Sequence, residues 1–420
     1  MTITPLDAWV HNITGDDIQK YRLKQINATL RLAQKSQYYR MSLPERIESM
    51  SQFESLPTID AGTLTRAGAQ LACAPHSEIA RIVTLMTSGS TDTPKRVFFS
   101  EHDLELTVDY FANGLRELAS RGDVMAILLP CERPDGVGDL IARALMRIPV
   151  KPVRHGLVGS LAACVADLKN SNARSLVGTP VQTLAAARYC AARDIRLNID
   201  AVLLSTDNIP RIIVSELNKT WGCEVFEHYG MTEMGLGGAI DCRAHNGYHI
   251  RENDLFVEIL DDNGRAVAEG EYGEVVITTL TREAMPLIRY RTGDISKLMK
   301  DECVCGSRLR RLAPLRGRIG GDVKMACGAL VRIIEFDEVL FGITKVSGYT
   351  IKALCDDNLL EINLESQESV GAADTGHVME LLNSSGLIQD LEIRISTTLL
   401  PDVLPPVNGK RTVSSVISGE

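Results

Sequence analysis

The segment TSGSTDTPK, residues 87–95, places several hydroxyl side chains, one glycine and a lysine between two apolar runs. Backbone N–H groups, hydroxyl donors and one cation are the groups that bind the oxygens of a polyphosphate. The segment lacks the second glycine and the GK[ST] ending of a Walker A loop, and the run RVFF that follows is typical of a strand. We therefore predict a different kind of phosphate-binding loop at the edge of a sheet, with a Ser/Thr-rich hairpin turn as the alternative.

Thiol and imidazole side chains gather in two further segments. DCRAHNGYHI, residues 241–250, contains Cys242, His245 and His249, and ECVCGS, residues 302–307, contains Cys303 and Cys305. Thiolates and imidazoles together favour a tetrahedral zinc ion. The spacing alone is weak evidence, because Cys-x-Cys is tight for one tetrahedral ion and the two segments are far apart in the sequence. Reduced thiols without a metal are therefore the alternative.

The elements that must position these residues alternate along the first half of the chain. Strand-like runs alternate with amphipathic helices, which predicts an α/β protein with a mostly parallel, helix-covered sheet. One helix is expected over residues 101–118, with a capping box formed by Ser100 and Asp103. The strand-like runs are residues 79–86, 123–130, 148–153, 174–178, 200–206 and 223–230.

The pattern changes in the second half of the chain. Residues 254–300 contain short strands and turns, with Asn263 and Gly264 as a hairpin turn, which predicts a small antiparallel sheet or barrel. A fresh alternation of strands and helices begins after residues 311–322. We therefore expect an N-terminal domain of residues 1–316, with 254–300 as a β-rich subdomain, and a small C-terminal α+β domain of residues 317–420.

The charge balance argues against a nucleic-acid or membrane partner. Lys and Arg number 45 against 54 Asp and Glu, giving a net charge of −9. We find no apolar run as long as a membrane span, and the start MTITPLDAWV lacks the pattern of a signal peptide. We expect a cytoplasmic protein with a small-molecule partner. Its lone cysteines, among them Cys73, Cys164, Cys190 and Cys355, suit reduced core thiols.

Five segments follow one another along the chain: TSGSTDTPK, HYGMTEMG (228–235), RYRTGD (289–294), LRGR (315–318) and PPVNGK (405–410). Together they resemble the motifs of the adenylate-forming superfamily, which includes acyl-CoA synthetases, stand-alone adenylation enzymes and luciferases. Within it the chain is most similar to the phenylacetate-CoA ligase group and its coenzyme F390 synthetase relatives. That similarity rests on TPLDAWV, GYHIRENDLFVEIL (247–260), GEVVITTLTREAMPLIRYRTGD (273–294) and CVCGSR (303–308). The resemblance implies a large AMP-binding domain followed by a small mobile lid domain.

The resemblance also implies how ATP is bound. The first segment would wrap the β- and γ-phosphates, Tyr229 would border adenine, and Asp294 would accept both ribose hydroxyls. Ser205, Thr206 and Asp207 stand where relatives carry an adenine loop. The implied ATP- and AMP-binding residues are Thr87, Ser88, Gly89, Ser90, Thr91, Lys95, Ser205, Thr206, Asp207, Tyr229, Gly230, Met231, Asp294 and Arg318.

The implied catalytic residues are Lys410, Thr232 and Glu233. Lys410 would stabilise the charge that develops as the acyl-adenylate forms, Thr232 would contact the α-phosphate, and Glu233 would ligate Mg²⁺. The implied reaction is the ATP-dependent activation of a carboxylic acid with release of pyrophosphate, followed by thioester formation with coenzyme A. One alternative is an adenylation enzyme that loads a carrier protein. Another is a nucleotide-binding protein without turnover, for which Asp92 and Gly320 are the arguments because they depart from the family pattern.

The resemblance also implies a class of acid substrate and a metal site. The acyl pocket is expected beside Tyr110, His228 and Gly235, and an aryl or arylacetic acid is the favoured substrate because the group prefers it. Part of the group has a structural zinc that joins the two cysteine segments. The oligomeric state stays open, with a homodimer as one of the alternatives. The preferred zinc ligands are Cys242, His249, Cys303 and Cys305, with His245 as the alternative nitrogen ligand.

Overall fold

The computed structural model describes residues 16–85, 94–402, 404 and 411–416. The chain divides into two compact units and passes back and forth between them. The first unit contains residues 1–117, 143–148 and 228–316, and the second contains residues 118–142, 149–227 and 317–420. Among the helices that the structure describes, none has the length and apolar character needed to cross a bilayer.

The first described elements of the first unit are helical. The long helix α1 (Asp16–Ala33) buries Ile26 and Leu30. The side chain of Asp60 caps the helix α3 (Ala61–Ala67) by accepting from the N–H of Thr63 at 2.7 Å. The shorter elements are α2 (Met50–Glu54), α3 (Ala61–Ala67) and the 3-10 turns Tyr39–Met41, Gly68–Leu71 and His76–Glu78.

Two strands flank the predicted phosphate-binding segment. β1 (Arg81–Leu85) pairs antiparallel with β2 (Lys95–Phe99) in a two-stranded sheet. We expected the run 79–86 to join the parallel sheet, and this expectation was wrong. The connection to β2 is too short for the crossover that a parallel pair requires, so the two strands form a hairpin instead.

The helix α4 (Glu101–Gly114) follows β2 and continues into the 3-10 turn Leu115–Glu117. The predicted capping box is confirmed, since Ser100 accepts from the N–H of Asp103 and the Asp103 carboxylate accepts from the N–H of Ser100. Leu104 and Val108 lie on the buried face of the helix. This packing fixes the position of Tyr110 and Phe111 one turn further along.

The rest of the first unit is antiparallel. The end of β7 (Glu224–Tyr229) pairs with β8 (Ala239–Ile240), β8 with β9 (Tyr248–Ile250), and β9 with β13 (Arg311–Leu312). Separately, β10 (Leu255–Leu260), β11 (Gly273–Thr279) and β12 (Tyr290–Ser296) pair antiparallel, as the sequence predicted for this segment. In the turn after β10, Gly264 has a φ of +75°, a conformation that favours glycine.

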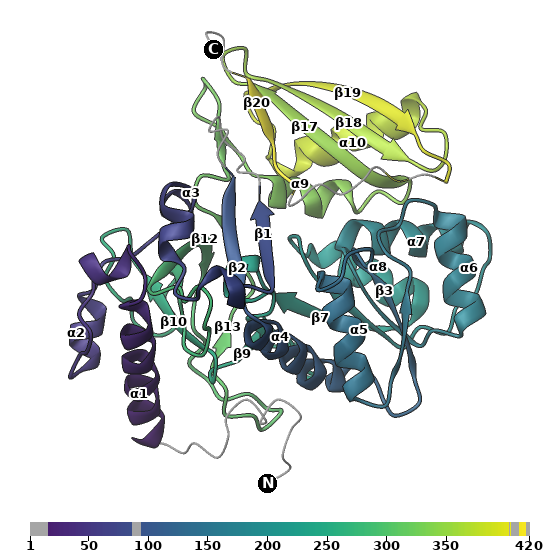
Figure 1. The fold of residues 1–420 in the computed structure, drawn as a ribbon. Coiled ribbons are helices and arrows are strands. Elements are labelled where there is room, and N and C mark those ends of the chain that lie inside the picture. Colours follow the sequence, from purple (N-terminus) through teal and green to yellow (C-terminus); the bar gives the residue numbers. More distant parts are fainter. Residues whose placement is uncertain (1–15, 86–93, 403, 405–410, 417–420) are drawn as a thin grey trace. The chain divides into compact units, whose positions relative to one another are not determined.

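The second unit contains the predicted parallel sheet. Every residue of β5 (Ser175–Gly178) and β6 (Ala201–Leu204) is buried, as expected for parallel strands with helices on both faces. The strands β3 (Val124–Leu128), β4 (Lys151–Arg154), β5, β6 and β7 pair in the order β4-β3-β5-β6-β7. The helices that alternate with them are α5 (Val137–Arg147), α6 (Leu161–Ser171), α7 (Pro180–Ala192) and α8 (Arg211–Trp221) (Figure 1).

Residues 317–420 belong to the same compact unit as this parallel sheet. They form a sheet in the order β19-β18-β17-β20, together with α9 and α10 (Figure 1). Leu184 and Leu217 share one hydrophobic cluster with Phe336 and Val346, so the core of this unit is continuous. The separate lid domain of residues 317–420 therefore stays a prediction. The elements are β14 (Gly317–Arg318), β15 (Val323–Lys324), β16 (Leu330–Val331), α9 (Ile333–Leu340), β17 (Val346–Leu354), β18 (Leu359–Ser366), α10 (Ala372–Ser385), β19 (Glu392–Leu399) and β20 (Ser414–Val416).

Candidate active site and candidate metal centre

Three segments of the first unit meet at the carboxylate of Glu233. Glu233 lies in the 3-10 turn Thr232–Met234 after β7 and is only 2% exposed. Lys95, the first residue of β2, forms an ion pair with its Oε1. The hydroxyl of Tyr290, the first residue of β12, donates to the same oxygen at 3.1 Å. The lysine that ends the predicted phosphate loop is therefore in direct contact with the predicted magnesium ligand.

These contacts keep Glu233 ionised. Burial alone raises the pKa of a carboxyl group, but the Lys95 ammonium and the Tyr290 hydroxyl favour the charged form more strongly. The pKa of Glu233 consequently lies below its ordinary value. The main chain is fixed as well, because Arg282 Nη1 donates to the carbonyl oxygen of Glu233 at 2.7 Å. The result is a rigidly held anionic oxygen donor next to a loop lysine.

A second buried carboxylate lies in the RYRTGD segment. The hydroxyl of Tyr229 donates to Oδ2 of Asp294 at 3.0 Å, and the N–H of Asp294 donates to Oγ1 of Thr292 at 3.1 Å. Asp294 is 1% exposed. Gly293 has a φ of +78°, so a glycine is favoured at the bend that orients this carboxylate. The predicted ribose residue and the predicted adenine residue are thus directly hydrogen-bonded.

The turn after β7 tolerates no side chain at Gly230. A Cβ there would lie 2.0 Å from the carbonyl oxygen of Leu236 and 2.6 Å from the ring of His228. Met231 and Thr232 follow and are half-buried. The close return of the chain onto itself explains why the segment after Tyr229 must begin with glycine.

An aromatic cage surrounds His228 near the end of β7. The ring centroids of Tyr110 and Phe111 on α4 lie 5.7 and 5.6 Å from that of His228. Burial of the ring, and to a lesser degree the guanidinium of Arg251, lower the pKa of His228 to about 3. The imidazole is therefore neutral at physiological pH.

Glycines border the same cage. A Cβ at Gly237 would lie 2.0 Å from the ring of Tyr110, so the chain passes directly against this side chain. The carbonyl oxygen of Gly235 accepts from Oγ1 of Thr107 on α4 at 2.9 Å. The structure therefore brings together the residues predicted for the acyl end of the pocket, namely Tyr110, His228 and Gly235.

The predicted adenine loop lies in the second unit, directly after β6. Ser205 is buried, Thr206 is exposed with a φ of +77°, and Asp207 is held by two donors. The N–H of Asn208 donates to its Oδ1 at 2.8 Å, and Nε of Arg411 donates to its Oδ2 at 2.9 Å. Arg318 lies in β14 and is exposed.

Several predicted residues lie outside the described part of the chain. They are Thr87, Ser88, Gly89, Ser90, Thr91, Asp92 and Lys410.

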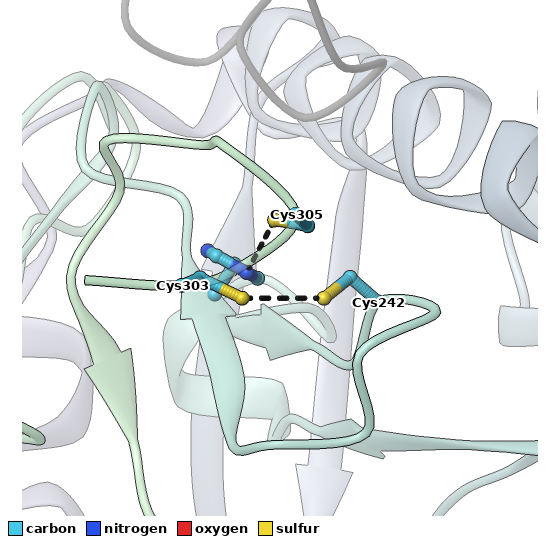
Figure 2. Close-up of side chains that lie close together, drawn as sticks. Cys242, Cys303 and Cys305 are labelled. Carbon is cyan, nitrogen blue, oxygen red and sulfur yellow. Dashed lines mark hydrogen bonds between the residues drawn. The ribbon is translucent and has the colours of Figure 1, made fainter. Parts of the chain in front are cut away.

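The candidate metal centre is formed by four side chains of the first unit. Cys242, His249, Cys303 and Cys305 each place one ligand atom within 4.8 Å of the others. The Sγ atoms of Cys242 and Cys303 are 3.7 Å apart, and Sγ of Cys305 is 3.5 Å from Nε2 of His249. Figure 2 shows the three cysteine side chains directed toward a common centre. This is the preferred ligand set of the sequence.

Antiparallel pairing explains how these distant residues meet. Cys242 follows β8, His249 lies in β9, and the Cys303 segment leads into β13, which pairs with β9. His245 lies outside the cluster that the described residues form, and its Nδ1 is 2.6 Å from Oδ2 of Asp241. All ten cysteines are free thiols. The lone cysteines named above, Cys73, Cys164, Cys190 and Cys355, are buried as predicted.

A comparison with known proteins identifies the family to which this chain belongs. The family model described as "AMP-binding enzyme" matches residues 18–281. The chain belongs to this family. The match includes α4, β7 and Glu233, and it ends before Asp294 and the CVCGS segment.

Relatives of this AMP-binding enzyme include ligases that join an acid to coenzyme A. A phenylacetate-coenzyme A ligase of Thermus thermophilus is 27% identical over 361 residues, which is 80% of this chain and 79% of the relative. The structure of 2-hydroxyisobutyryl-CoA ligase in the postadenylation state with 2-HIB-AMP has a TM-score of 0.79 at 20% identity, covering 96% of this chain and 90% of that chain. A complex of the same ligase with 2-HIB-AMP and CoA in the thioesterification state has a TM-score of 0.68 at 20% identity, covering 97% and 91%.

These findings confirm two predictions. The chain is a member of the adenylate-forming superfamily and of its phenylacetate-CoA ligase-like group. Its fold is the mixed α/β fold of adenylate-forming enzymes.

Sequence reasoning missed three residues of the AMP-binding enzyme that contact predicted site residues. Tyr290 binds Glu233, and it was inside the quoted RYRTGD motif. Arg411 binds Asp207, and its signal was its place directly after Lys410. Asp337 on α9 binds Arg411, and no motif in the sequence marked it.

Proposed function

We propose that this AMP-binding enzyme is an ATP-dependent acyl-CoA ligase. It would activate an aryl or arylacetic acid as the acyl-adenylate, release pyrophosphate and transfer the acyl group to coenzyme A. The observation that carries the proposal is the buried contact of Lys95 and Tyr290 with the ionised Glu233, in a chain of this family. The names of its relatives, an acid–coenzyme A ligase and a ligase bound to an acyl-AMP and CoA, support the same reaction class.

The first half-reaction joins the acid to AMP. A carboxylate oxygen attacks the α-phosphorus of ATP, the bond from this phosphorus to the bridging oxygen breaks, and pyrophosphate leaves with the electron pair. Most of the protein's contribution to such a reaction is positioning and charge neutralisation. Residues 87–91 would bind the departing phosphates, and Lys410 would stabilise the charge that develops on the carboxylate and α-phosphate.

Glu233 and Lys95 have complementary parts in this half-reaction. Glu233 fits a magnesium ligand because it is a buried, ionised oxygen donor, and Mg²⁺, when bound, supplies charge neutralisation on the phosphates. Lys95 would then exchange its carboxylate partner for a phosphate oxygen. Thr232, beside Glu233 in the same turn, would donate to the α-phosphate.

Asp294 and Tyr229 would hold the nucleoside. A carboxylate accepts from two neighbouring hydroxyls at once, which suits a ribose. The hydrogen bond from Tyr229 fixes the direction of this carboxylate. Gly230 and Met231 continue from Tyr229 along the adenine. In the second unit, Ser205, Thr206 and Asp207 keep the adenine role, and Arg318 the ribose or phosphate role, that the resemblance implies.

The aromatic cage supports an aryl or arylacetic acid as substrate. Tyr110 and Phe111 offer ring faces and edges, and neutral His228 adds a polar edge without a charge. The close approach that Gly237 allows is taken by the ring of Tyr110, so an aromatic side chain lies directly against the main chain here. Two aromatic rings beside an uncharged imidazole support an aryl group as the preferred acyl substituent.

The second half-reaction forms the thioester. The sulfur of coenzyme A, whose thiol proton passes to water, attacks the carbonyl carbon of the acyl-adenylate, the bond from this carbon to the phosphate oxygen breaks, and AMP leaves with the electron pair. The four protein ligands of the proposed zinc would leave no open coordination position, so its role would be structural.

We propose a structural zinc at Cys242, His249, Cys303 and Cys305. Three sulfurs and one imidazole nitrogen are a closed tetrahedral donor set of the kind that structural zinc prefers. Zinc–sulfur bonds of about 2.3 Å place the sulfurs of one tetrahedral site about 3.8 Å apart. The 3.7 Å between Cys242 and Cys303 agrees with this spacing. The ion would tie the chain after β8 to the segment before β13.

The test is carboxylate-dependent ATP–pyrophosphate exchange across aryl, arylacetic and short aliphatic acids. Wild-type protein should exchange with aryl or arylacetic acids, and Lys410→Ala should abolish the exchange. Lys352→Ala is the matched control, because Lys352 lies on the surface of β17, half exposed and paired with Glu361. ATP binding without exchange for any acid would contradict the proposal and favour a nucleotide-binding protein without turnover.

A second assay identifies which thiol accepts the acyl group. Once an acid is known, thioester formation is measured with coenzyme A and with a phosphopantetheinylated carrier protein. Coenzyme A should be consumed in step with AMP release. Turnover with the carrier protein alone would replace the ligase by a carrier-loading adenylation enzyme.

A further inference from the structure

One arginine of the second unit is held by two aspartates from different parts of the chain. Nε of Arg411 donates to Oδ2 of Asp207 at 2.9 Å. Nη1 and Nη2 donate to the two carboxylate oxygens of Asp337 on α9, at 2.6 and 2.9 Å. The bidentate pair and the single contact use all three nitrogens of the guanidinium, and this planar fork gives the side chain one defined orientation.

The surroundings mark this as a built site and not as a surface ion pair. The side chains of Asp337, Asp207 and Arg411 are 0%, 8% and 19% exposed. The rings of Phe341 and Tyr349 lie 4.8 and 5.6 Å from the guanidinium carbon, so the charge is also flanked by aromatic faces. Ion pairs that are this buried are screened little by salt.

Asp337 is itself tied in place. The hydroxyl of Tyr349 on β17 donates to its Oδ1, and Nδ2 of Asn208 donates to its Oδ2 at 3.2 Å. Burial raises the pKa of Asp337, while Arg411 and these donors oppose the rise. The pKa of Arg411 is raised, because the charges of Asp337 and Asp207 outweigh the effect of burial. A permanently charged guanidinium therefore links α9 to the loop after β6.

Other contacts already hold the C-terminal sheet against this part of the unit. Arg188 on α7 donates to the carbonyl oxygens of Val346 and Phe341. The carboxylate of Glu338 accepts from the N–H groups of Arg211 and Ile212 at the start of α8, at 2.7 and 3.0 Å. Arg411 is therefore one of several contacts that hold α9 and β17, and its bond to Asp207 adds a link to the loop after β6.

We propose that Arg411 is a positioning residue of the ligase reaction, which clamps the chain directly after Lys410 to the Ser205–Thr206–Asp207 loop through Asp207 and to α9 through Asp337. The inference rests on the proposed function, since it gives Arg411 a part in delivering Lys410. In this role Arg411 would act through its neighbours and not by binding ATP or the acid. Through its two carboxylate partners it would hold the main chain at residue 411 and orient the loop that is assigned to adenine.

Misplacing a catalytic group by about 1 Å can cost on the order of 100-fold in rate. Arg411→Gln and Asp207→Asn should therefore lower kcat for ATP–pyrophosphate exchange by roughly 10- to 100-fold, with a smaller change in KM for the acid. Arg411→Lys should be intermediate, because one ammonium group cannot grip both carboxylates in a fork. The double variant Asp207→Asn/Arg411→Gln should be no slower than Arg411→Gln, since both changes remove one shared contact.

A structural readout accompanies the kinetics. Hydrogen exchange of residues 411–416 should become faster in Asp207→Asn, which keeps the pair of Arg411 with Asp337 and so avoids an unpaired buried charge. The matched control is Arg394→Gln. Arg394 lies on β19 of the same sheet, is 62% exposed and pairs only with Glu392 among the ion pairs that the structure describes. This control should change neither the exchange protection nor the rate.

The possible outcomes separate this inference from the proposed function. An active wild type with Arg411→Gln and Asp207→Asn within about twofold of it would overturn the role of Arg411 alone. Additive losses in the double variant would also overturn it, because the two residues would then act separately. A wild type that exchanges with no acid would overturn the proposed function and this role with it. If Arg411→Gln does not fold, Asp207→Asn and its hydrogen exchange decide the question.

Discussion

Lys95 and Glu233 form an ion pair that connects the end of the predicted phosphate loop to the turn after β7. Both side chains are largely buried, so neither charge is well solvated by itself. Tyr290 adds a third contact to the same carboxylate oxygen. A ligand that draws one member of this set away changes the electrostatic environment of the others.

Lys95→Met should destabilise the protein strongly. The change leaves the buried, ionised Glu233 without its cation, and breaking a buried ion pair in this way typically costs about 3–5 kcal/mol. Urea denaturation of wild type and variant measures the difference. The double variant Lys95→Met/Glu233→Gln should recover much of the loss because it removes the unpaired charge. Equal stability of Lys95→Met and wild type would show that the pair contributes nothing.

Asp294→Asn should weaken ATP binding more than it slows the chemical step. The change removes the charge that would bind the ribose hydroxyls, and hydrogen bonds to charged groups are worth about 1.5–3 kcal/mol. KM for ATP should therefore rise by roughly 10- to 100-fold. Tyr229→Phe, which removes one neutral donor to Asp294, should have a smaller effect. Asp262→Asn, in the exposed turn after β10, is the matched control, and an equal rise there would argue against the assignment.

The cysteine cluster should bind zinc through His249 and not through His245. Metal analysis of purified protein should find zinc in wild type and His245→Ala, and should find it lost or reduced in His249→Ala and Cys303→Ser. The zinc-free variants should unfold at lower temperature, because the free energy of metal binding contributes to folding. Cys327→Ser, at an exposed cysteine, is the control. Zinc content that is unchanged in His249→Ala would contradict the ligand set.

His228 should make stability depend on pH below neutrality. Its folded pKa of about 3 lies below its ordinary value of 6.5, so between these values the unfolded chain binds a proton that the folded chain does not. The stabilisation from the neutral ring is complete above pH 6.5 and is lost progressively as the pH falls toward 3. The contribution approaches about 1.4 kcal/mol per pH unit.

The measurement compares unfolding free energies of wild type and His228→Gln between pH 7 and pH 5. The variant should have the shallower dependence on pH. His377→Gln, at a histidine that is 59% exposed, should retain the wild-type dependence. Parallel curves for wild type and His228→Gln would mean that His228 titrates normally in the folded protein.

Local patterns in the sequence predicted those parts of the structure that depend on neighbouring residues. The capping box of Ser100 and Asp103 is one example, because its two hydrogen bonds join residues three positions apart. The cysteine segments were found by their residue types. Their meeting depends on the antiparallel pairing of β9 with β13, and only the resemblance suggested it in advance.

Such local patterns do not predict contacts between residues that are far apart in the sequence. The sequence marked Glu233 and Lys95 separately, but no periodicity pairs residues this far apart, and Tyr290 was overlooked as their partner. The run 79–86 read correctly as a strand and was given the wrong sheet, because alternation shows which residues can be buried and not which strand lies beside them. Asp337 was missed because an aspartate on an amphipathic helix has no distinctive sequence context.

The interleaved path of the chain has a consequence for how this protein can be recombined. Most of each compact unit is assembled from stretches that alternate along the gene, so neither unit can be transferred to a relative by a single crossover. Residues 317–420 are the exception, since they form one continuous terminal stretch. A chimera exchanged at that point would inherit Arg411 and Asp337 from one parent and Asp207 from the other. If the two parents differ at these three positions, the chimera would fold but lose the contacts of Arg411, and we expect its activity to fall.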